Sequence, residues 1–175
     1  METAVFGGGC FWCTEAIFSA MKGVHSVRPG YCGGHVEAPS YDAVCAGTTG
    51  HIEVVAVEYD EKVVSFETML DVFFGTHDPT TPGRQGHDVG PQYQSAVFAQ
   101  NDMQHTMTEQ KIRELDQQGV FPAKICTLIL PPQKFWVAED YHHDFFERNP
   151  GQGYCQVVVS PKVMKFRKNF YDYLK

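Results

Sequence analysis

The run Thr3-Ala4-Val5-Phe6-Gly7-Gly8-Gly9-Cys10-Phe11-Trp12-Cys13 joins two predicted elements of opposite kind. Residues 3–6 are expected to form a short strand, which the glycine triplet ends. Residues 11–21 are expected to form a helix, because their apolar side chains recur at helical spacing. Those apolar positions are Phe11, Ile17, Phe18 and Met21. Cys10 and Cys13 are therefore expected at a strand-to-helix turn.

A cysteine in this position is suited to act as a nucleophile. The positive end of the helix macrodipole stabilises a thiolate at the helix N-terminus, and the thiolate is the reactive form. The preceding glycines reach backbone conformations that other residues avoid, and they leave room for a substrate. Cys13 follows Cys10 by three residues, which brings it within reach for a disulfide. The run therefore predicts a reactive thiol at Cys10.

The cysteine pair has two alternative roles that stay open at this point. Cys10 and Cys13 could be small buried hydrophobic residues, or they could be half of a zinc site. Zinc needs two further ligands, and the chain has no second Cys-x-x-Cys pair. The adjacent His142 and His143 lack the usual ligand spacing. We therefore favour catalysis and expect no metal, although the spacing alone is shared by many thiol oxidoreductases.

Length and composition narrow the classes of protein. The chain has 175 residues, of which 43% are hydrophobic, and this size suits one domain spanning 1–175. Its formal charge of -7 argues against a broad nucleic-acid surface. No apolar run is long enough for a membrane span, and residues 1–5 do not look like a signal peptide. We expect a cytoplasmic monomer whose six cysteines are mostly free.

The remaining sequence alternates irregularly between strand and helix patterns. Expected strands lie at residues 24–32, 51–59, 93–99, 125–130 and 157–159, and expected helices at 65–77, 102–118, 138–148 and 161–174. Residues 78–92 carry three prolines and three glycines and are expected to form a long functional loop. The irregular order favours the α+β class, with helices packed against a mixed sheet.

Several motifs together resemble the A-type peptide methionine sulfoxide reductases. The first is Gly-Cys-Phe-Trp-Cys at 9–13, followed by Glu15. The others, in chain order, are Gly30-Tyr31-Cys32-Gly33-Gly34, the block 41–53, His77-Asp78-Pro79, Gly90-Pro91-Gln92-Tyr93-Gln94-Ser95, and the stretch from Asn149-Pro150 to Phe166-Arg167. The similarity covers nearly the whole chain in order.

The resemblance implies a fold and a reaction. The fold would be a two-layer α/β sandwich with a ferredoxin-like core. The reaction would be reduction of the S epimer of methionine sulfoxide, either free or in oxidised proteins. Thioredoxin would restore the enzyme as an external dithiol reductant, so no bound cofactor is expected.

The resemblance also implies that Glu53 is the acid that protonates the sulfoxide oxygen. Glu53 lies on the same strand face as Val55 and Val57 in the expected strand 51–59. A glutamate among apolar neighbours is partly buried, which favours the neutral, proton-donating form. Without the resemblance, an exposed strand glutamate with no role would be the simpler interpretation.

Five further residues receive roles from the resemblance. The hydroxyls of Tyr41 and Tyr93 would hydrogen-bond the sulfoxide oxygen, where charge develops. Asp88 would support the site. Phe11 and Trp12 would form an apolar cup for the substrate methyl group. Adjacent helical residues do not share a face, so two aromatics between two cysteines are hard to attribute to the core alone.

The second redox thiol is where this chain departs from the commonest family pattern. Many members have glycine at the position of Cys13 and carry resolving cysteines in a glycine-rich C-terminal tail. Residues 165–175 contain no cysteine and look helical. We therefore expect Cys13 to resolve the sulfenic acid, with Cys155 as the runner-up. The remaining cysteines, which we expect to be structural, are Cys32, Cys45 and Cys126.

Three other functions compete with sulfoxide reduction. A general thiol–disulfide oxidoreductase shares the strand, the Cys-x-x-Cys turn and the helix, but has no need of Glu53 or the tyrosines. A Cys-His hydrolase is less favoured, because no local Cys-His-Asn signature is visible. A zinc or redox-sensor module would need more metal ligands than the pattern supplies.

Overall fold

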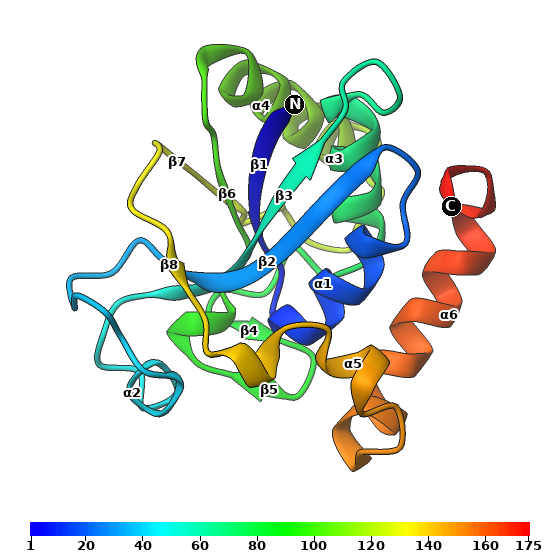
Figure 1. Cartoon of the computed structure of the whole chain (residues 1–175). Coiled ribbons are helices and arrows are strands. Elements are labelled where there is room, and N and C mark those ends of the chain that lie inside the picture. Colours follow the sequence, from blue (N-terminus) through cyan, green and yellow to red (C-terminus); the bar gives the residue numbers. More distant parts are fainter.

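A computed structural model describes residues 1–175, and a six-stranded sheet forms its centre (Figure 1). The strands are β1 (Glu2–Gly7), β2 (Val24–Cys32), β3 (Ile52–Tyr59), β6 (Ala96–Phe98), β7 (Leu128–Leu130) and β8 (Trp136–Val137). They lie in the order β7-β6-β1-β3-β2-β8. Every neighbouring pair is antiparallel except β6 and β7, which run parallel. The sheet is therefore mixed, as the sequence predicts.

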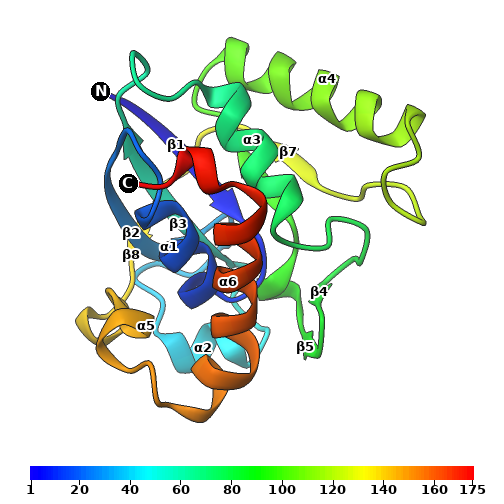
Figure 2. The same cartoon turned by 90° about the vertical axis from the view of Figure 1, so that its right-hand side faces the viewer.

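The order of elements around the sheet centre is that of a ferredoxin-like fold. Helices α1 (Phe11–Ser19) and α3 (Phe66–Gly75) alternate with the strands as β1-α1-β2-β3-α3-β6. These strands are arranged as β6-β1-β3-β2, so β3 lies between β1 and β2. Figures 1 and 2 show both helices on one side of the sheet, together with α6 (Ser160–Asn169). The predicted α+β, two-layer arrangement is confirmed.

The main core lies between the sheet and the helices, and aromatic rings fill much of it. Phe6 of β1 is fully buried and stacks on Phe18 and Phe73, with ring centroids 5.0 and 4.9 Å apart. Phe66 adds a third stacked ring at 6.0 Å. These rings come from β1, α1 and α3, so one cluster fixes both helices against the sheet.

The two faces of β3 decide where Glu53 points. Val55 and Val57 are fully buried in the main core beneath the helices. Val54 and Ala56 belong to a smaller apolar cluster on the opposite face. Because strand side chains alternate between faces, Glu53 lies on the helix side, next to the start of α1. The predicted shared face of Glu53, Val55 and Val57 is confirmed.

Two predictions in the C-terminal third are wrong. Residues 157–159 do not form a strand but continue a π-helical turn, Cys155–Val159, that leads into α6. A run of three valines suggests a strand, but Val157 is exposed while Val159 is buried. The expected helix 138–148 is broken, because Asp144 adopts a left-handed φ of 54°. What remains is a 3-10 turn, Asp140–His142, and the short helix α5 (Phe145–Arg148).

Other differences concern short elements. The predicted loop 78–92 contains a small hairpin of β4 (Arg84–Gln85) and β5 (Asp88–Val89). A 3-10 turn, Pro91–Tyr93, precedes β6, so the expected strand 93–99 is shorter than predicted. The expected strand 125–130 is likewise reduced to β7. Two elements have no counterpart in the prediction, namely β8 and helix α2 (Tyr41–Cys45).

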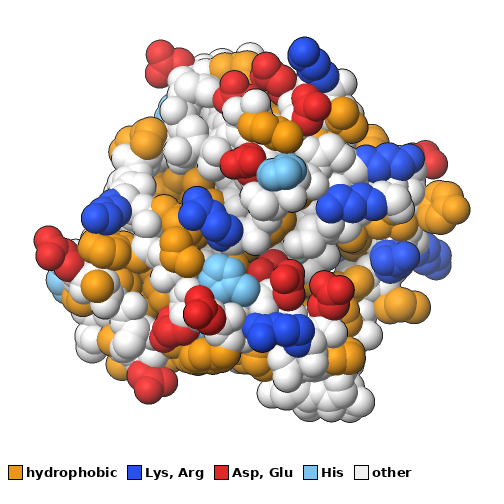
Figure 3. Space-filling view, viewed as in Figure 1, with side chains coloured by type: hydrophobic (Ala, Val, Ile, Leu, Met, Phe, Trp, Pro, Cys, Tyr) orange, Lys and Arg blue, Asp and Glu red, His pale blue; other side chains and the backbone are white.

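The surface fits the acidic composition. Helix α4 (Asp102–Gln117) is largely polar and packs beside α3. Figure 3 shows acidic and basic side chains interspersed over one face, without one continuous basic surface. None of the helices combines the length and the apolar character needed to cross a membrane.

The aromatic cluster gives a stability prediction. Phe6→Ala removes the ring that contacts three others, so we expect the free energy of unfolding to fall by about 3–5 kcal/mol. Val89→Ala is the control, because Val89 is 72% exposed and should change stability by less than about 0.5 kcal/mol. Chemical denaturation would measure both. A loss for Phe6→Ala no larger than the control's would contradict a core built on this ring.

Candidate active site

The glycine triplet brings the chain from β1 to α1 and presents Cys10 at the helix N-cap. Gly9 has a φ of +92°, which favours glycine, and a Cβ there would lie 2.6 Å from Cγ of Gln85. Cys10 is extended at the N-cap, and Cys13 is the third residue of α1. The strand-to-helix turn predicted for both cysteines is therefore present.

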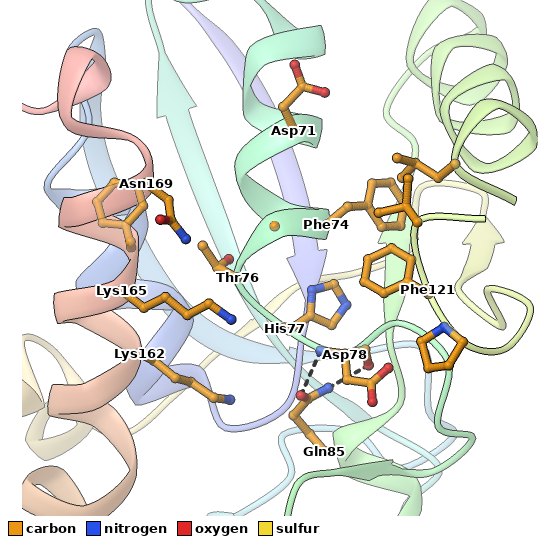
Figure 4. A pocket seen from close by; sticks show the side chains of 15 residues that line it. Asp71, Phe74, Thr76, His77, Asp78, Gln85, Phe121, Lys162, Lys165 and Asn169 are labelled. Carbon is orange, nitrogen blue, oxygen red and sulfur yellow. Dashed lines mark hydrogen bonds between the residues drawn. The ribbon is translucent and has the colours of Figure 1, made fainter. Parts of the chain in front are cut away.

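Buried polar side chains pack against the glycine triplet, and Figure 4 shows two of them, His77 and Gln85, with the hydrogen bonds between Gln85 and Asp78. The side-chain amide of Gln85 pairs with the backbone of Asp78, accepting from its N–H at 2.9 Å and donating to its carbonyl at 2.8 Å. His77 packs beneath Gly8, and burial lowers the pKa of His77 to about 4. Both groups also line a cavity of about 580 Å³, although no predicted catalytic residue does.

Three thiols meet in one buried cluster. Cys10 is 7% exposed, and Cys13 and Cys155 are 1% and 0% exposed. Val159 of the π-helical turn completes the cluster. All six cysteines of the chain are free. The fold thus brings both candidate resolving thiols to Cys10, although Cys155 is 145 residues away from it in sequence.

The electrostatics of the pair differ from the expectation based on the helix dipole alone. Burial raises the pKa of Cys10 well above its usual value, and the hydrogen bond with Cys13 and the nearby Glu53 add to this rise. The backbone N–H of Trp12 opposes it. The hydrogen bond with Cys10 lowers the pKa of Cys13. The raised pKa keeps the Cys10 thiol protonated at neutral pH, which the sequence does not indicate.

Glu53 is buried beside the first turn of α1 and is 1% exposed. Its Oε1 accepts a hydrogen bond from the backbone N–H of Phe11 at 3.2 Å, while its Oε2 is buried without a partner. Burial raises the pKa of Glu53 to about 8, with Asp88 and Cys13 adding to the rise. At neutral pH this side chain is mostly a carboxylic acid, and one of its oxygens has no hydrogen-bond partner within the protein.

The two predicted tyrosines lie around the same point. Tyr41 begins α2 and Tyr93 ends the 3-10 turn after the small hairpin, and both are half-buried. Burial raises the pKa of each hydroxyl, and the neighbouring acidic groups of Glu53 and Cys45 add to the rise, with a smaller contribution from Cys10. The Tyr41 hydroxyl also forms a hydrogen bond with Cys45. Both hydroxyls therefore lie near Glu53 and Cys45 and remain protonated donors.

Aromatic side chains form a wall beside Cys10. Trp12 stacks on Phe145 of α5, with ring centroids 3.8 Å apart and planes within 8°. Its indole N–H donates to Nδ1 of the fully buried His142 at 3.0 Å. Tyr154 packs edge-on against Trp12 and donates its hydroxyl to Asp88 Oδ2. The indole ring is therefore held on several sides while part of it stays exposed.

Phe11 lies deeper than Trp12. It has no exposed surface and packs against Tyr31, Tyr41 and His142, with centroid distances of 5.6, 6.3 and 5.0 Å. The Phe11 ring thus supports Tyr41, one of the two tyrosines that the sequence assigns to the site. The backbone N–H of Phe11 donates a hydrogen bond to Glu53.

Sequence reasoning misses the part of the site supplied by residues 139–154. The sequence suggests His142 only as a metal ligand, and it assigns no role to Glu139, Phe145 or Tyr154. Tyr154 directly precedes Cys155, and this adjacency is the one available signal. No group of three or more His, Cys, Asp or Glu side chains is arranged to hold a metal ion.

Comparison with known proteins identifies the family. The family model described as "Peptide methionine sulfoxide reductase" matches residues 2–174. A peptide methionine sulfoxide reductase MsrA of Ralstonia nicotianae is 55% identical over 174 residues, covering 97% of this chain and 91% of the relative. The reduced form of Mxr1 from Saccharomyces cerevisiae superimposes with a TM-score of 0.80 at 32% identity, covering 88% of each chain.

A second structure of Mxr1, solved in complex with Trx2, has a TM-score of 0.55 at 23% identity and covers 82% of this chain and 84% of that one. At this identity it speaks for the fold alone. The match to the family model over nearly the whole chain and the 55% identity carry the assignment. The chain therefore belongs to the peptide methionine sulfoxide reductase family.

Proposed function

We propose that this chain reduces the S epimer of methionine sulfoxide, free or within proteins, with Cys10 as the nucleophile. The observation that carries the mechanism is the buried carboxyl of Glu53, which has one oxygen without a partner and lies close to the Cys10 thiol. Sulfoxide reduction needs a proton donor at this point, because the oxygen is a poor leaving group until it is protonated. Disulfide exchange has no such requirement.

Glu53 is the proton donor in this proposal. Its Oε1 accepts from the N–H of Phe11, so the acidic proton resides on Oε2. The pKa of about 8 keeps the group protonated at neutral pH. A neutral carboxyl also avoids repelling the thiolate that forms at Cys10.

The hydroxyls of Tyr41 and Tyr93 supply hydrogen bonds to the sulfoxide oxygen. Both remain protonated because burial and nearby acidic groups raise their pKa values. Donors already in place stabilise charge as it develops and need little reorganisation. Asp88 supports the site through its hydrogen bond from Tyr154 and through its charge, which favours the neutral form of Glu53.

The apolar side of the substrate faces the aromatic wall. Trp12 offers a partly exposed ring, fixed by Phe145 and His142, that suits a methyl group. Phe11 has no exposed surface, so it contributes to the cup by supporting Tyr41 and His142 from within the core. A methyl contact on one side and hydroxyl donors on the other suit the two substituents of a sulfoxide.

The reaction then proceeds with a simple balance of atoms. The sulfur of Cys10 loses its proton and attacks the sulfoxide sulfur, while Glu53 gives a proton to the oxygen. Methionine leaves, the hydroxyl group is transferred to the cysteine sulfur, and Cys10 becomes a sulfenic acid. The proton lost by the Cys10 thiol replaces the one that Glu53 donated.

Cys13 is our choice for the thiol that resolves the sulfenic acid. It condenses with Cys10 to form a disulfide and releases water. Its hydrogen bond with Cys10 and its lowered pKa favour this role. Cys155 is the alternative, because it is buried in the same cluster.

A dithiol protein completes the cycle by reducing the disulfide. Mxr1, a structural relative of this chain, has been solved in complex with Trx2. We infer that thioredoxin is the external reductant here and that the chain uses no bound cofactor. Its cytoplasmic location, its monomeric state and its organisation as one domain over 1–175 stay predictions.

Replacing the nucleophile should abolish the reaction. We expect Cys10→Ser to leave no measurable reduction of methionine sulfoxide, because a serine oxygen is a far weaker nucleophile than a cysteine sulfur and cannot form the disulfide. Cys32→Ser is the matched control, since Cys32 is buried in the cluster on the opposite face of the sheet. Turnover with a thioredoxin system would be measured, and substantial activity of Cys10→Ser would sink the assignment.

Glu53→Gln should separate proton donation from thiol reactivity. Loss of the acid should slow sulfoxide reduction by about 100-fold or more, yet less than Cys10→Ser does. The same change removes the charge that raises the pKa of Cys10. The pH midpoint for alkylation of Cys10 by iodoacetamide should therefore move to lower pH.

The control for this variant is Glu58→Gln, on the same strand but partly exposed. It should leave both measurements unchanged. An unchanged reduction rate in Glu53→Gln would remove this residue from the role of acid.

The resolving thiol can be identified after one turnover without reductant. Mass mapping should find a Cys10–Cys13 disulfide in the unaltered protein and in Cys155→Ser. Cys13→Ser should accumulate sulfenic acid at Cys10, which a dimedone adduct would detect. A Cys10–Cys155 bridge in the unaltered protein would refute our choice.

A further inference from the structure

Glu139 links two parts of the site that are far apart in sequence. It follows β8 and is the N-cap of the 3-10 turn Asp140–His142. Its Oε1 accepts from the hydroxyl of Tyr31 at 2.9 Å, and its Oε2 accepts from the backbone N–H of Tyr41 at 2.9 Å. Both carboxylate oxygens are thus used, by donors on β2 and on α2.

The bond to Tyr41 matters because it fixes the backbone of α2, whereas the Tyr41 ring is held by packing on Phe11 and His142, with ring centroids 6.3 and 4.4 Å apart. This helix has five residues, and only Val44 is buried. The N-cap Ser40 binds the N–H of Ala43, which leaves the N–H of Tyr41 to be satisfied from outside the helix. Glu139 provides that acceptor. A bond to the backbone of Tyr41 fixes the point from which its side chain extends toward Glu53.

The second oxygen connects the same carboxylate to the sheet below the site. Tyr31 is fully buried, and it pairs with Glu53 across β2 and β3. The hydroxyl of Tyr31 therefore anchors Glu139 to the strand position directly beside the acid. Because Tyr31 holds Oε1 of Glu139, the other oxygen, Oε2, has a fixed position from which it accepts the N–H of Tyr41.

The backbone of Glu139 contributes to the aromatic wall as well. Its carbonyl accepts from the N–H of His142 at 3.0 Å, which closes the turn that carries the acceptor of the Trp12 indole. This carbonyl does not depend on the side chain. A side-chain substitution therefore removes the bonds to Tyr31 and Tyr41 and leaves the turn intact.

Glu139 is ionised in this setting. Burial opposes ionisation, but the N–H of Tyr41 and the hydroxyl of Tyr31 outweigh it, and the net effect lowers the pKa of Glu139. Hydrogen bonds to a charged acceptor are stronger than those between neutral groups. The Glu139 carboxylate is thus suited to fix the N-terminus of α2 through its hydrogen bond from Tyr41.

We propose that Glu139 is a positioning residue that holds the Tyr41 hydroxyl toward the sulfoxide oxygen. The inference rests on the proposed function, in which Tyr41 donates a hydrogen bond to that oxygen. Glu139 acts on the reaction only through Tyr41. Its effect therefore falls on the chemical step more than on substrate binding, because the bond from Tyr41 strengthens as charge develops.

A double-mutant cycle between Glu139 and Tyr41 tests this. Glu139→Gln keeps the size of the side chain but has a single acceptor oxygen for two donors. We expect kcat to fall by roughly tenfold with little change in KM. Tyr41→Phe should also lower kcat, and Glu139→Gln should cause no further fall when added to Tyr41→Phe.

Asp140→Asn is the matched control, because Asp140 is the adjacent, exposed acid and the hydrogen bonds from Tyr31 and Tyr41 go to Glu139 instead. It should leave kcat unchanged. Thermal unfolding of each variant would verify that Glu139→Gln is folded at the assay temperature.

The outcomes separate the two proposals. A tenfold fall that persists in the Tyr41→Phe background overturns the positioning role, and so does full activity of Glu139→Gln. Neither result touches the nucleophile, which Cys10→Ser tests by itself. Full activity of Tyr41→Phe, combined with slow turnover of Glu139→Gln, also overturns the inference, because Glu139 would then act by another route.

Discussion

The hydrogen bond from the backbone N–H of Phe11 to Glu53 is the contact on which the site depends. It joins the first turn of α1 to the middle strand β3 in a region with almost no exposed surface. A helix N-terminus leaves N–H groups that need acceptors, and here a buried carboxyl is one of them. The same bond fixes which oxygen of Glu53 is free and brings the acid beside the N-cap cysteine. One hydrogen bond thus connects the sheet to the helix and also positions the proposed acid.

The C-terminal third of the chain completes what this contact begins. It supplies Phe145 and His142 to hold the Trp12 indole, Tyr154 to bind Asp88, and Cys155 to the thiol cluster. His142 and Phe145 lie in short elements, whereas Tyr154 and Cys155 lie where a π-helical turn leads without a break into α6. Their positions depend on the turn at Asp144 and on this π-helical turn. The site therefore has one half built on the sheet and another built from short elements and an irregular helix start.

This division determines what can be predicted from sequence. The strands and helices of the ferredoxin-like core have clear periodicity, so the patterns for β1, α1, β2, β3, α3 and α4 fall close to where these elements lie. Helix α2 and β8 are too short for a periodic pattern, and Asp144 has no local signal for a left-handed φ. The valines at 157–159 suggest a strand because β-branched residues favour strands, but tertiary packing places them in a helical turn.

Cys10, Glu53 and both tyrosines come together as expected. The neutral state of Cys10 depends on burial by residues distant in sequence, which no local pattern records.

The burial of Cys10 also bears on how a reducing enzyme survives among oxidants. Hydrogen peroxide oxidises thiolates far faster than thiols, so a cysteine with a raised pKa in a nearly closed cluster reacts slowly with it. In the proposed mechanism, a sulfoxide differs from peroxide in bringing an oxygen that Glu53 protonates and a methyl group that Trp12 contacts. The substrate, rather than the resting environment, would then activate the cysteine. Such an enzyme would discriminate between methionine sulfoxide and hydrogen peroxide, which occur under the same oxidising conditions.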